Sequence, residues 1–273
     1  MKLKDIPFSD KNFCALILKN NPTYTSDTEV KNIDEITIDD AKLNSTEDLK
    51  YFFNLKNLNL SNCNISVINL AENPILENLN LSNNKLNAID LSHNPNLESL
   101  DLSYNQLQNI NLSHNPKLLQ IILNNNKIDE LNLSQQKQLI GVNLSFNNLK
   151  YLDVKNNLQL KSLFAQSNQI DSIETDFLNN LKDLNLSDNR LNKIDLSKNT
   201  ALESIALINN MISDIKLPIA NFTSIFLSNN KIVDLELPPT LKFESLWLYE
   251  NPLSEKTIKV LSEKKGVELG NKK

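Results

Sequence analysis

Few residues of this 273-residue chain have side chains and spacing suited to catalysis or metal binding. The two histidines, His93 and His114, are 21 residues apart, and each stands in a Ser-His-Asn-Pro segment. A stable metal site needs further protein ligands, and neither segment supplies one. Asn and Pro both favour turns, so the segments are typical of turns. We therefore expect no metal site and no cofactor.

The two cysteines, Cys14 and Cys63, are too few for a disulfide framework or a zinc site. Cys14 lies in the apolar run FCALIL and is expected to pack as a small hydrophobic residue. The sequence contains no nucleophile paired with a base, no phosphate-binding loop and no carboxylate pair on a recognisable scaffold. It therefore predicts a protein that is not an enzyme.

An asparagine that recurs at a fixed spacing points to a structural hydrogen-bonding role rather than to catalysis. Ten segments of the form L-x-x-L-x-L-x-x-N-x-L follow one another; eight of the nine intervals between their starts are 21 residues and one is 20. A single column of the repeat holds nine asparagines and one cysteine. Its members are Cys63, Asn84, Asn105, Asn126, Asn147, Asn168, Asn189, Asn210, Asn230 and Asn251. A buried amide offers two donors and an acceptor, so we expect this column to form a structural ladder that binds backbone groups inside the turns.

The elements that hold this ladder follow from the rest of the repeat. Each LxL is expected to be a short strand that pairs in parallel with its neighbours. After the strand and turns, 21 residues leave no room for a full helix, so extended or 3-10 segments are expected on the other side. The pattern resembles leucine-rich repeats, and most closely the bacterial internalin-like branch with its LxxLxLSxNxLxxIDLSxNP units. The resemblance implies an α/β repeat solenoid with a parallel sheet on its concave face.

Both ends of such an array need a cap, because a terminal repeat would expose its leucines. A helix beginning at Ser9 or Asp10 is predicted for FSDKNFCALILKN, within an N-terminal cap at 1–32. The repeats are predicted at 33–253, with a degenerate first repeat that has Ala41 in the asparagine column. A C-terminal cap and tail follow at 254–273, with Ser254 as N-cap, Ile258, Val260 and Leu261 on the apolar face, and Gly266 at the end.

The resemblance also implies a function. Internalin-like arrays bind proteins through the concave sheet, often proteins of a host organism, so this chain is expected to be a non-catalytic interaction module and a candidate virulence factor or effector. The alternative is a structural or self-associating component of the bacterial surface or envelope. Residues 236–253 also resemble the Leu-Pro repeats of secreted bacterial effectors.

The residues that alternate with the buried leucines of each strand should face solvent, and they indicate where a partner would bind. Asn and Asp dominate the strand column at first, and large apolar or aromatic residues enter it from Ile122 onward. Flanking columns add Tyr104, Phe146, Ile208 and Tyr249. The predicted partner-binding residues are Tyr104, Ile122, Phe146, Phe164, Ile208, Phe226, Trp247 and Tyr249. Exposed aromatics on a rigid sheet suit a binding hot spot. In the alternative interpretation these residues are sequence drift, and the C-terminal helix covers Trp247 and Tyr249.

Charge limits the class of partner. A net charge of −5 gives no basic stripe for nucleic acid, and no apolar run is long enough to cross a membrane. The expected partner is therefore a protein, bound by a monomer that neither contacts nucleic acid nor inserts into a membrane. No leader is apparent in MKLKDIPFSDKNF. The localisation expected is cytoplasmic or that of an effector exported without a leader, unless a leader has been removed.

Overall fold

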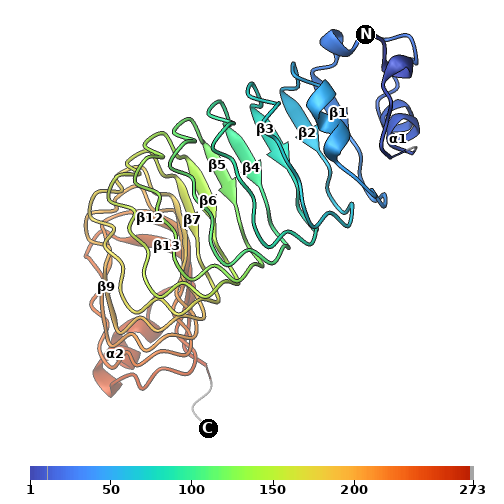
Figure 1. The fold of residues 1–273 in the computed structure, drawn as a ribbon. Coiled ribbons are helices and arrows are strands. Elements are labelled where there is room, and N and C mark those ends of the chain that lie inside the picture. Colours follow the sequence, from blue (N-terminus) through green and yellow to red (C-terminus); the bar gives the residue numbers. More distant parts are fainter. Residues whose placement is uncertain (11, 271–273) are drawn as a thin grey trace. The chain divides into compact units, whose positions relative to one another are not determined.

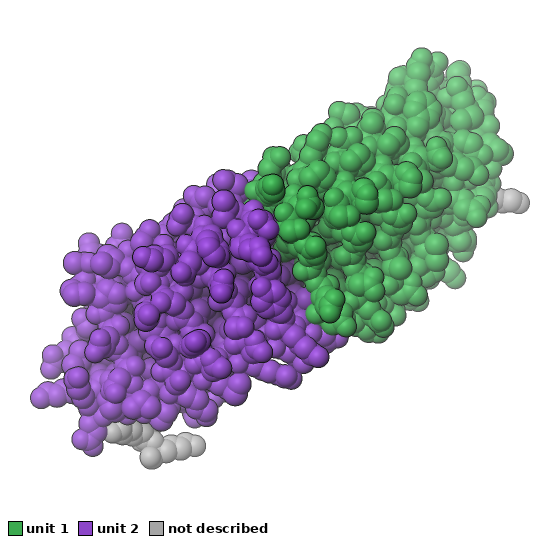
Figure 2. All heavy atoms as spheres, turned by 60° about the vertical axis from the view of Figure 1, so that its left-hand side comes forward, with its two compact units in different colours: residues 1–139 green, residues 140–273 purple. Residues whose placement is uncertain are grey.

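The computed structural model describes residues 1–10 and 12–270. The chain forms two compact units, residues 1–139 and 140–273 (Figure 2). Each unit is a stack of coils, one sequence repeat to a coil, so the predicted repeat solenoid with a parallel sheet is confirmed. The division falls inside the repeat region predicted at 33–253. The predicted domain boundaries stay a prediction.

In unit 1 the strands lie side by side in sequence order and all pair in parallel (Figure 1). The central residue of each is buried and pairs with the central residue of the next, as Leu58 does with Leu79 and Leu79 with Leu100. A period of 21 residues thus keeps the register constant. The strands are β1 (Glu35–Thr37), β2 (Asn57–Asn59), β3 (Asn78–Asn80), β4 (Ser99–Asp101) and β5 (Gln120–Ile122).

Unit 2 continues the pattern and adds a second, smaller sheet. The main sheet has the order β6-β7-β8-β10-β12-β13-β14, and β9 pairs with β11 in parallel. The strands are β6 (Gly141–Asn143), β7 (Ser162–Phe164), β8 (Asp183–Asn185), β9 (Lys193–Asp195), β10 (Ser204–Ala206), β11 (Asp214–Lys216), β12 (Asn221–Phe226), β13 (Lys242–Trp247) and β14 (Val267–Glu268). We call the solvent side of the main sheet the sheet face, and the side of β9 and β11 the back face.

The core consists of stacked aliphatic columns. Leu76, Leu79, Leu81, Leu86 and Leu91 of one coil are all at most 2% exposed, and most of the corresponding residues of the other coils are buried as well. Each buried leucine contributes roughly 1.5–3 kcal/mol. The back segments are extended or turn-like, as predicted, with one 3-10 segment, η3 (Glu47–Tyr51), in the first full coil.

The N-terminal cap contains η1 (Leu3–Asp5), α1 (Phe13–Asn20) and η2 (Val30–Asn32). Phe13 and Ile17 of α1 are fully buried and seal the first coil. The prediction that the helix begins at Ser9 or Asp10 is wrong, since α1 starts at Phe13 after Asn12. Both predicted residues bind the repeats, and Asp10 also accepts a hydrogen bond from the Asn12 N–H at 2.9 Å. The buried Asp48 carboxylate accepts hydrogen bonds from the backbone and side chain of Ser9, and Asp10 accepts one from the Asn44 N–H at 2.8 Å.

The outer edge of β1 is closed by a side chain. The Asn21 amide donates to the Thr37 carbonyl and accepts from the Thr37 N–H, both at 3.1 Å. Asn21 follows directly after α1 and is itself buried. The cap therefore supplies the two hydrogen bonds that another strand would make at this residue, and an exposed edge is avoided.

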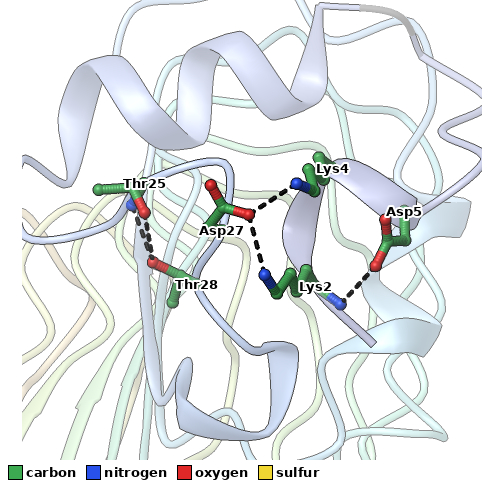
Figure 3. A network of polar contacts seen from close by, with 6 residues as sticks. All are labelled: Lys2, Lys4, Asp5, Thr25, Asp27 and Thr28. Carbon is green, nitrogen blue, oxygen red and sulfur yellow. Dashed lines mark hydrogen bonds and ion pairs between the residues drawn. The ribbon is translucent and has the colours of Figure 1, made fainter.

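Exposed ion pairs hold the first residues of the chain against the loop before η2. Lys2 Nζ and Lys4 Nζ lie 3.0 and 2.7 Å from one Asp27 carboxylate oxygen (Figure 3). Hydrogen bonds from Lys4 and Lys2 lower the pKa of Asp27. Because all three side chains are largely exposed, these pairs add little to stability.

At the other end, α2 (Glu255–Ser262) begins as predicted, with the Ser254 side chain accepting a hydrogen bond from the Thr257 N–H. Leu261 faces the core, but Val260 is exposed and the buried Thr257 takes its expected place. Gly266 does not end the helix, which stops at Ser262; it leads into β14, a strand that the sequence did not predict. No helix among the described residues is both long and apolar enough to span a membrane.

Candidate functional site

The asparagine column fixes the loop that follows each sheet strand. Asn105 Nδ2 donates to the carbonyls of Leu81, Leu102 and Ser103 at 2.9–3.2 Å, and its Oδ1 accepts from the Leu86 N–H at 2.9 Å. Asn189 and Asn210 make the equivalent bonds in unit 2. Where the column holds Cys63, the thiol donates to the Ile38 and Ser61 carbonyls instead. Each loop is therefore tied to the preceding coil.

The residue before each ladder position adopts a left-handed backbone. These residues are Asn62, Asn83, Tyr104, Asn125, Phe146, Ser167, Asp188, Asn209, Asn229 and Glu250, with φ between 54° and 57°. Asn and Asp tolerate this conformation, whereas a bulky residue is strained by it. The asparagines also bond to one another along the surface, as Asn83 Nδ2 does to Asn62 Oδ1 at 2.9 Å.

Tyr104 and Phe146 are the aromatic exceptions in this left-handed column. Tyr104 is 56% exposed and Phe146 is 49% exposed. Burial of the side chain therefore does not offset the strain of the left-handed backbone at either residue. Strain retained without a folding benefit motivates a functional hypothesis. Both residues therefore remain candidates for contact with a partner, Tyr104 on unit 1 and Phe146 on unit 2.

Three predicted residues come together on the sheet face of unit 2. Phe226 of β12 pairs in register with Trp247 of β13, and their ring centroids are 4.5 Å apart. The Tyr249 ring lies edge-on to Trp247 at 6.1 Å. Trp247 is 36% exposed. We call Phe226, Trp247 and Tyr249 the aromatic surface; its rings contact one another and so present a continuous apolar area rather than a cage.

Strand β14 holds one side of the aromatic surface in place. The Tyr249 hydroxyl donates to the Glu268 carboxylate, and Trp247 pairs in register with Glu268. The approach of β14 needs glycine, because a Cβ on Gly266, whose φ is +81°, would lie 2.2 Å from the Glu244 carbonyl oxygen. The sequence signal was available: two of the three glycines, Gly266 and Gly270, flank this strand. Tyr249 is half-buried by β14, and α2 is not its hydrogen-bond partner.

The remaining predicted residues are more dispersed. Phe164 of β7 is 37% exposed, but β8 and β10 separate it from β12, which places it roughly 14 Å from Phe226 at the usual strand spacing. Ile208 is half-buried, and its N–H donates to Ser187 Oγ at 3.2 Å. Ile122 is half-buried on the sheet face of unit 1.

Small and acidic residues surround the aromatic surface. Ser224 and Ser245 lie on the same face of β12 and β13, and the hydroxyls of Ser204 and Ser224 are 2.7 Å apart. Glu268 and Glu250 flank Tyr249. Short side chains beside tall aromatic rings leave the rings accessible, and an apolar area with a polar rim is the anatomy of a protein-binding surface.

The side chains with potential catalytic or metal chemistry lie elsewhere and have local partners. His93 and His114 each share a hydrogen bond with the preceding serine, at 3.1 and 3.0 Å. Burial raises the pKa values of the Cys14 and Cys63 thiols, which favours their unreactive protonated forms. Across residues 1–10 and 12–270, no group of three or more His, Cys, Asp or Glu is arranged to hold a metal ion.

Comparison with known proteins agrees with this architecture. The leucine-rich repeat family model matches residues 54–74, and no curated protein sequence matches the chain. An internalin (inlF) from Listeria monocytogenes superposes with a TM-score of 0.77 at 21% identity, covering 99% of this chain and 93% of that one. Internalin C2 (inlC2) from the same organism gives 0.69 at 20% identity, covering 76% and 96%. YopM from Yersinia enterocolitica gives 0.64 at 26% identity, covering 74% of this chain and 44% of that one.

Proposed function

Because the chain folds as an internalin-like leucine-rich repeat solenoid, we propose that it is a non-catalytic interaction module that binds a partner protein through the sheet face of residues 140–273. Proteins with this fold are typically protein-interaction modules. The aromatic surface is the proposed centre of the interface, with Phe164, Phe146 and Ile208 as further contacts on the same unit. Tyr104 and Ile122 are proposed contacts on unit 1.

The contact between the Phe226 and Trp247 rings is the observation that carries this proposal. Both rings stand on six-residue strands, the longest of the sheet. Their positions are fixed before binding, so little conformational entropy is lost when a partner covers them. Aromatic residues of this kind are the commonest binding hot spots and cost about 2 kcal/mol or more when truncated.

A capture experiment tests the proposal. The whole chain carries a photo-crosslinking amino acid at Ser224, beside the aromatic surface, and is irradiated in extracts of candidate host cells and of bacteria. The expected result is a discrete crosslinked protein. The variant Phe226→Ala with Trp247→Ala should lower its yield at least about tenfold. Val67→Ala, at an exposed apolar site on unit 1, is the matched control and should leave the yield unchanged.

Two results would contradict the proposal. An undiminished yield from the double alanine variant would remove Phe226 and Trp247 from the interface. Light scattering that shows assembly rising with protein concentration, together with crosslinks only between copies of the chain, would favour a self-associating structural protein.

A further inference from the structure

The back face of unit 2 carries a groove that the sheet-face proposal does not use. Its volume is ≈ 570 Å³, and its floor includes Ile173, Ile194 and Thr175. Tyr151 and Phe177 lie along it and are 64% and 42% exposed. A cleft of this size accommodates a short peptide segment rather than a folded domain. We call it the back groove.

The back groove opens where a second buried ladder is interrupted. In most coils an Asn at the turn before the strand donates to two carbonyls of the preceding coil, as Asn94 Nδ2 does to the Leu70 and Asn73 carbonyls at 3.0 Å. The coil that begins at Leu160 has Leu178 in this column, and a leucine cannot donate. Its back segment, Glu174-Thr175-Asp176-Phe177, therefore lacks the usual tie to the preceding coil and leads an exposed phenylalanine along the groove.

The charged side chains that line the back groove favour a basic ligand. Four carboxylates line it, from Glu174, Asp176, Asp195 and Asp214, against two lysines, Lys193 and Lys216. Lys216 Nζ already lies 2.9 Å from the Asp195 carboxylate. Hydrogen bonds from Ser197 and Lys216 lower the pKa of Asp195 to about 2, so this carboxylate is anionic at neutral pH. Lys216 is thus paired within the groove, and the four carboxylates still outnumber the two lysines.

From this geometry we propose that the back groove is a second binding site, which takes an extended segment of a partner protein with an arginine or lysine next to an apolar side chain. Tyr151 and Phe177 provide apolar and cation–π contacts, and Asp176 and Asp214 provide charge-assisted hydrogen bonds. An acidic or phosphorylated segment would be repelled by the same carboxylates. The site lies on the face opposite the aromatic surface, so both could be occupied on one molecule.

A defined peptide tests this site independently of the partner sought above. The probe is the fluorescein-labelled peptide Gly-Leu-Arg-Phe-Arg-Leu-Gly, blocked at both ends, and its control has Glu in place of both Arg. Fluorescence anisotropy with the whole chain at about 20 mM salt should give at least about tenfold tighter binding for the arginine peptide, and the difference should shrink at about 150 mM salt. Amide signals of residues 172–177 and 193–195 should shift in heteronuclear NMR spectra.

Matched variants locate the binding. Phe177→Ser and Asp214→Asn change exposed side chains, so the fold should persist, and each should weaken arginine-peptide binding at least about fivefold. Phe53→Ser, at an exposed phenylalanine of unit 1, and Phe226→Ala, on the aromatic surface, should leave it unchanged. Equal affinity for the two peptides would overturn the proposal, as would full affinity in the Phe177→Ser and Asp214→Asn variants. Loss through Phe226→Ala would place the peptide on the aromatic surface instead.

Discussion

Two buried amide ladders run through unit 1, and they are satisfied to different degrees. In the ladder that follows the strands, Asn105 uses its donors and its acceptor. In the ladder that precedes the strands, Asn73, Asn94 and Asn115 are fully buried and donate to backbone carbonyls. Their Oδ1 atoms, however, have no hydrogen-bond partner in the described part of the chain. Asparagine therefore both donates and accepts hydrogen bonds at the turn after the strand, whereas at the turn before it the side chain only donates.

The difference in hydrogen bonding between the two ladders has an energetic consequence. An unpartnered buried acceptor costs about 1–3 kcal/mol. The fully satisfied ladder lies beside the loops that carry Tyr104 and Phe146, two of the proposed contacts with a partner. The less satisfied ladder is the one that is interrupted at the back groove.

The largest effect is expected from Asn105→Leu, which keeps the side chain's approximate size. It removes three donated bonds and leaves the buried Leu86 N–H without its acceptor. We expect the free energy of unfolding to fall by about 3 kcal/mol. Urea unfolding followed by far-UV circular dichroism measures this, with an unchanged denaturant slope as the check that the folded state is otherwise intact.

Asn94→Leu should lower the free energy of unfolding by about 1.5 kcal/mol, half the loss expected for Asn105→Leu. The Leu70 and Asn73 carbonyls keep their backbone donors, the Asn73 and Leu76 N–H groups, and the substitution removes the unpartnered Oδ1. The same unfolding experiment compares the two variants directly. Equal losses at Asn94 and Asn105 would show that the unpartnered oxygen has no energetic consequence.

Thr175→Val should remove the hydrogen bond to the side-chain oxygen of Asn199, a member of the ladder that precedes the strands. Asn199 would then resemble Asn73 and Asn94, whose oxygens have no such donor. The Thr175 hydroxyl donates to Asn199 Oδ1 at 2.9 Å, so valine leaves that oxygen without this donor at nearly constant volume. The expected loss in the free energy of unfolding is about 1 kcal/mol. Thr175→Ser retains the hydroxyl and should recover most of it; no recovery would assign the loss to packing instead.

The smallest effect is expected at the exposed, left-handed column. Tyr104→Asn places a residue that tolerates φ of 54° and should raise the free energy of unfolding by about 0.5 kcal/mol. Thermal and urea unfolding measure the change. A destabilised variant would mean that the Tyr104 side chain contributes to folding and would weaken its proposed role in binding.

The repeat made most of the fold predictable from the sequence. A column with nine asparagines in register specifies parallel coils, and the alternation around each LxL specifies which side chains face solvent. The start of α1 was mispredicted because the side chains of Ser9 and Asp10 bond with Asp48 and Asn44, which are distant in sequence. Val260 and β14 lie beyond the periodic region, where only local patterns were available.

The candidate site was predictable in part, for the same reason. Column position was enough to place Phe226 next to Trp247, because neighbouring repeats pair in register. It did not show that Glu268 holds Tyr249, since this contact depends on β14. The back groove was not predicted either, because the bond between Thr175 and Asn199 depends on the stacking of coils rather than on any local motif.

The way Asn21 closes the first strand bears on what kinds of assembly are open to this protein. Fibres of β-structure grow when a strand of one molecule pairs with the exposed edge strand of the next. Growth stops at an edge whose backbone groups are already hydrogen-bonded within the molecule. Because Asn21 already binds both the N–H and the carbonyl of Thr37, the edge of β1 is not free to pair with a strand of another molecule. Any polymer of this protein would therefore have to be nucleated elsewhere on its surface.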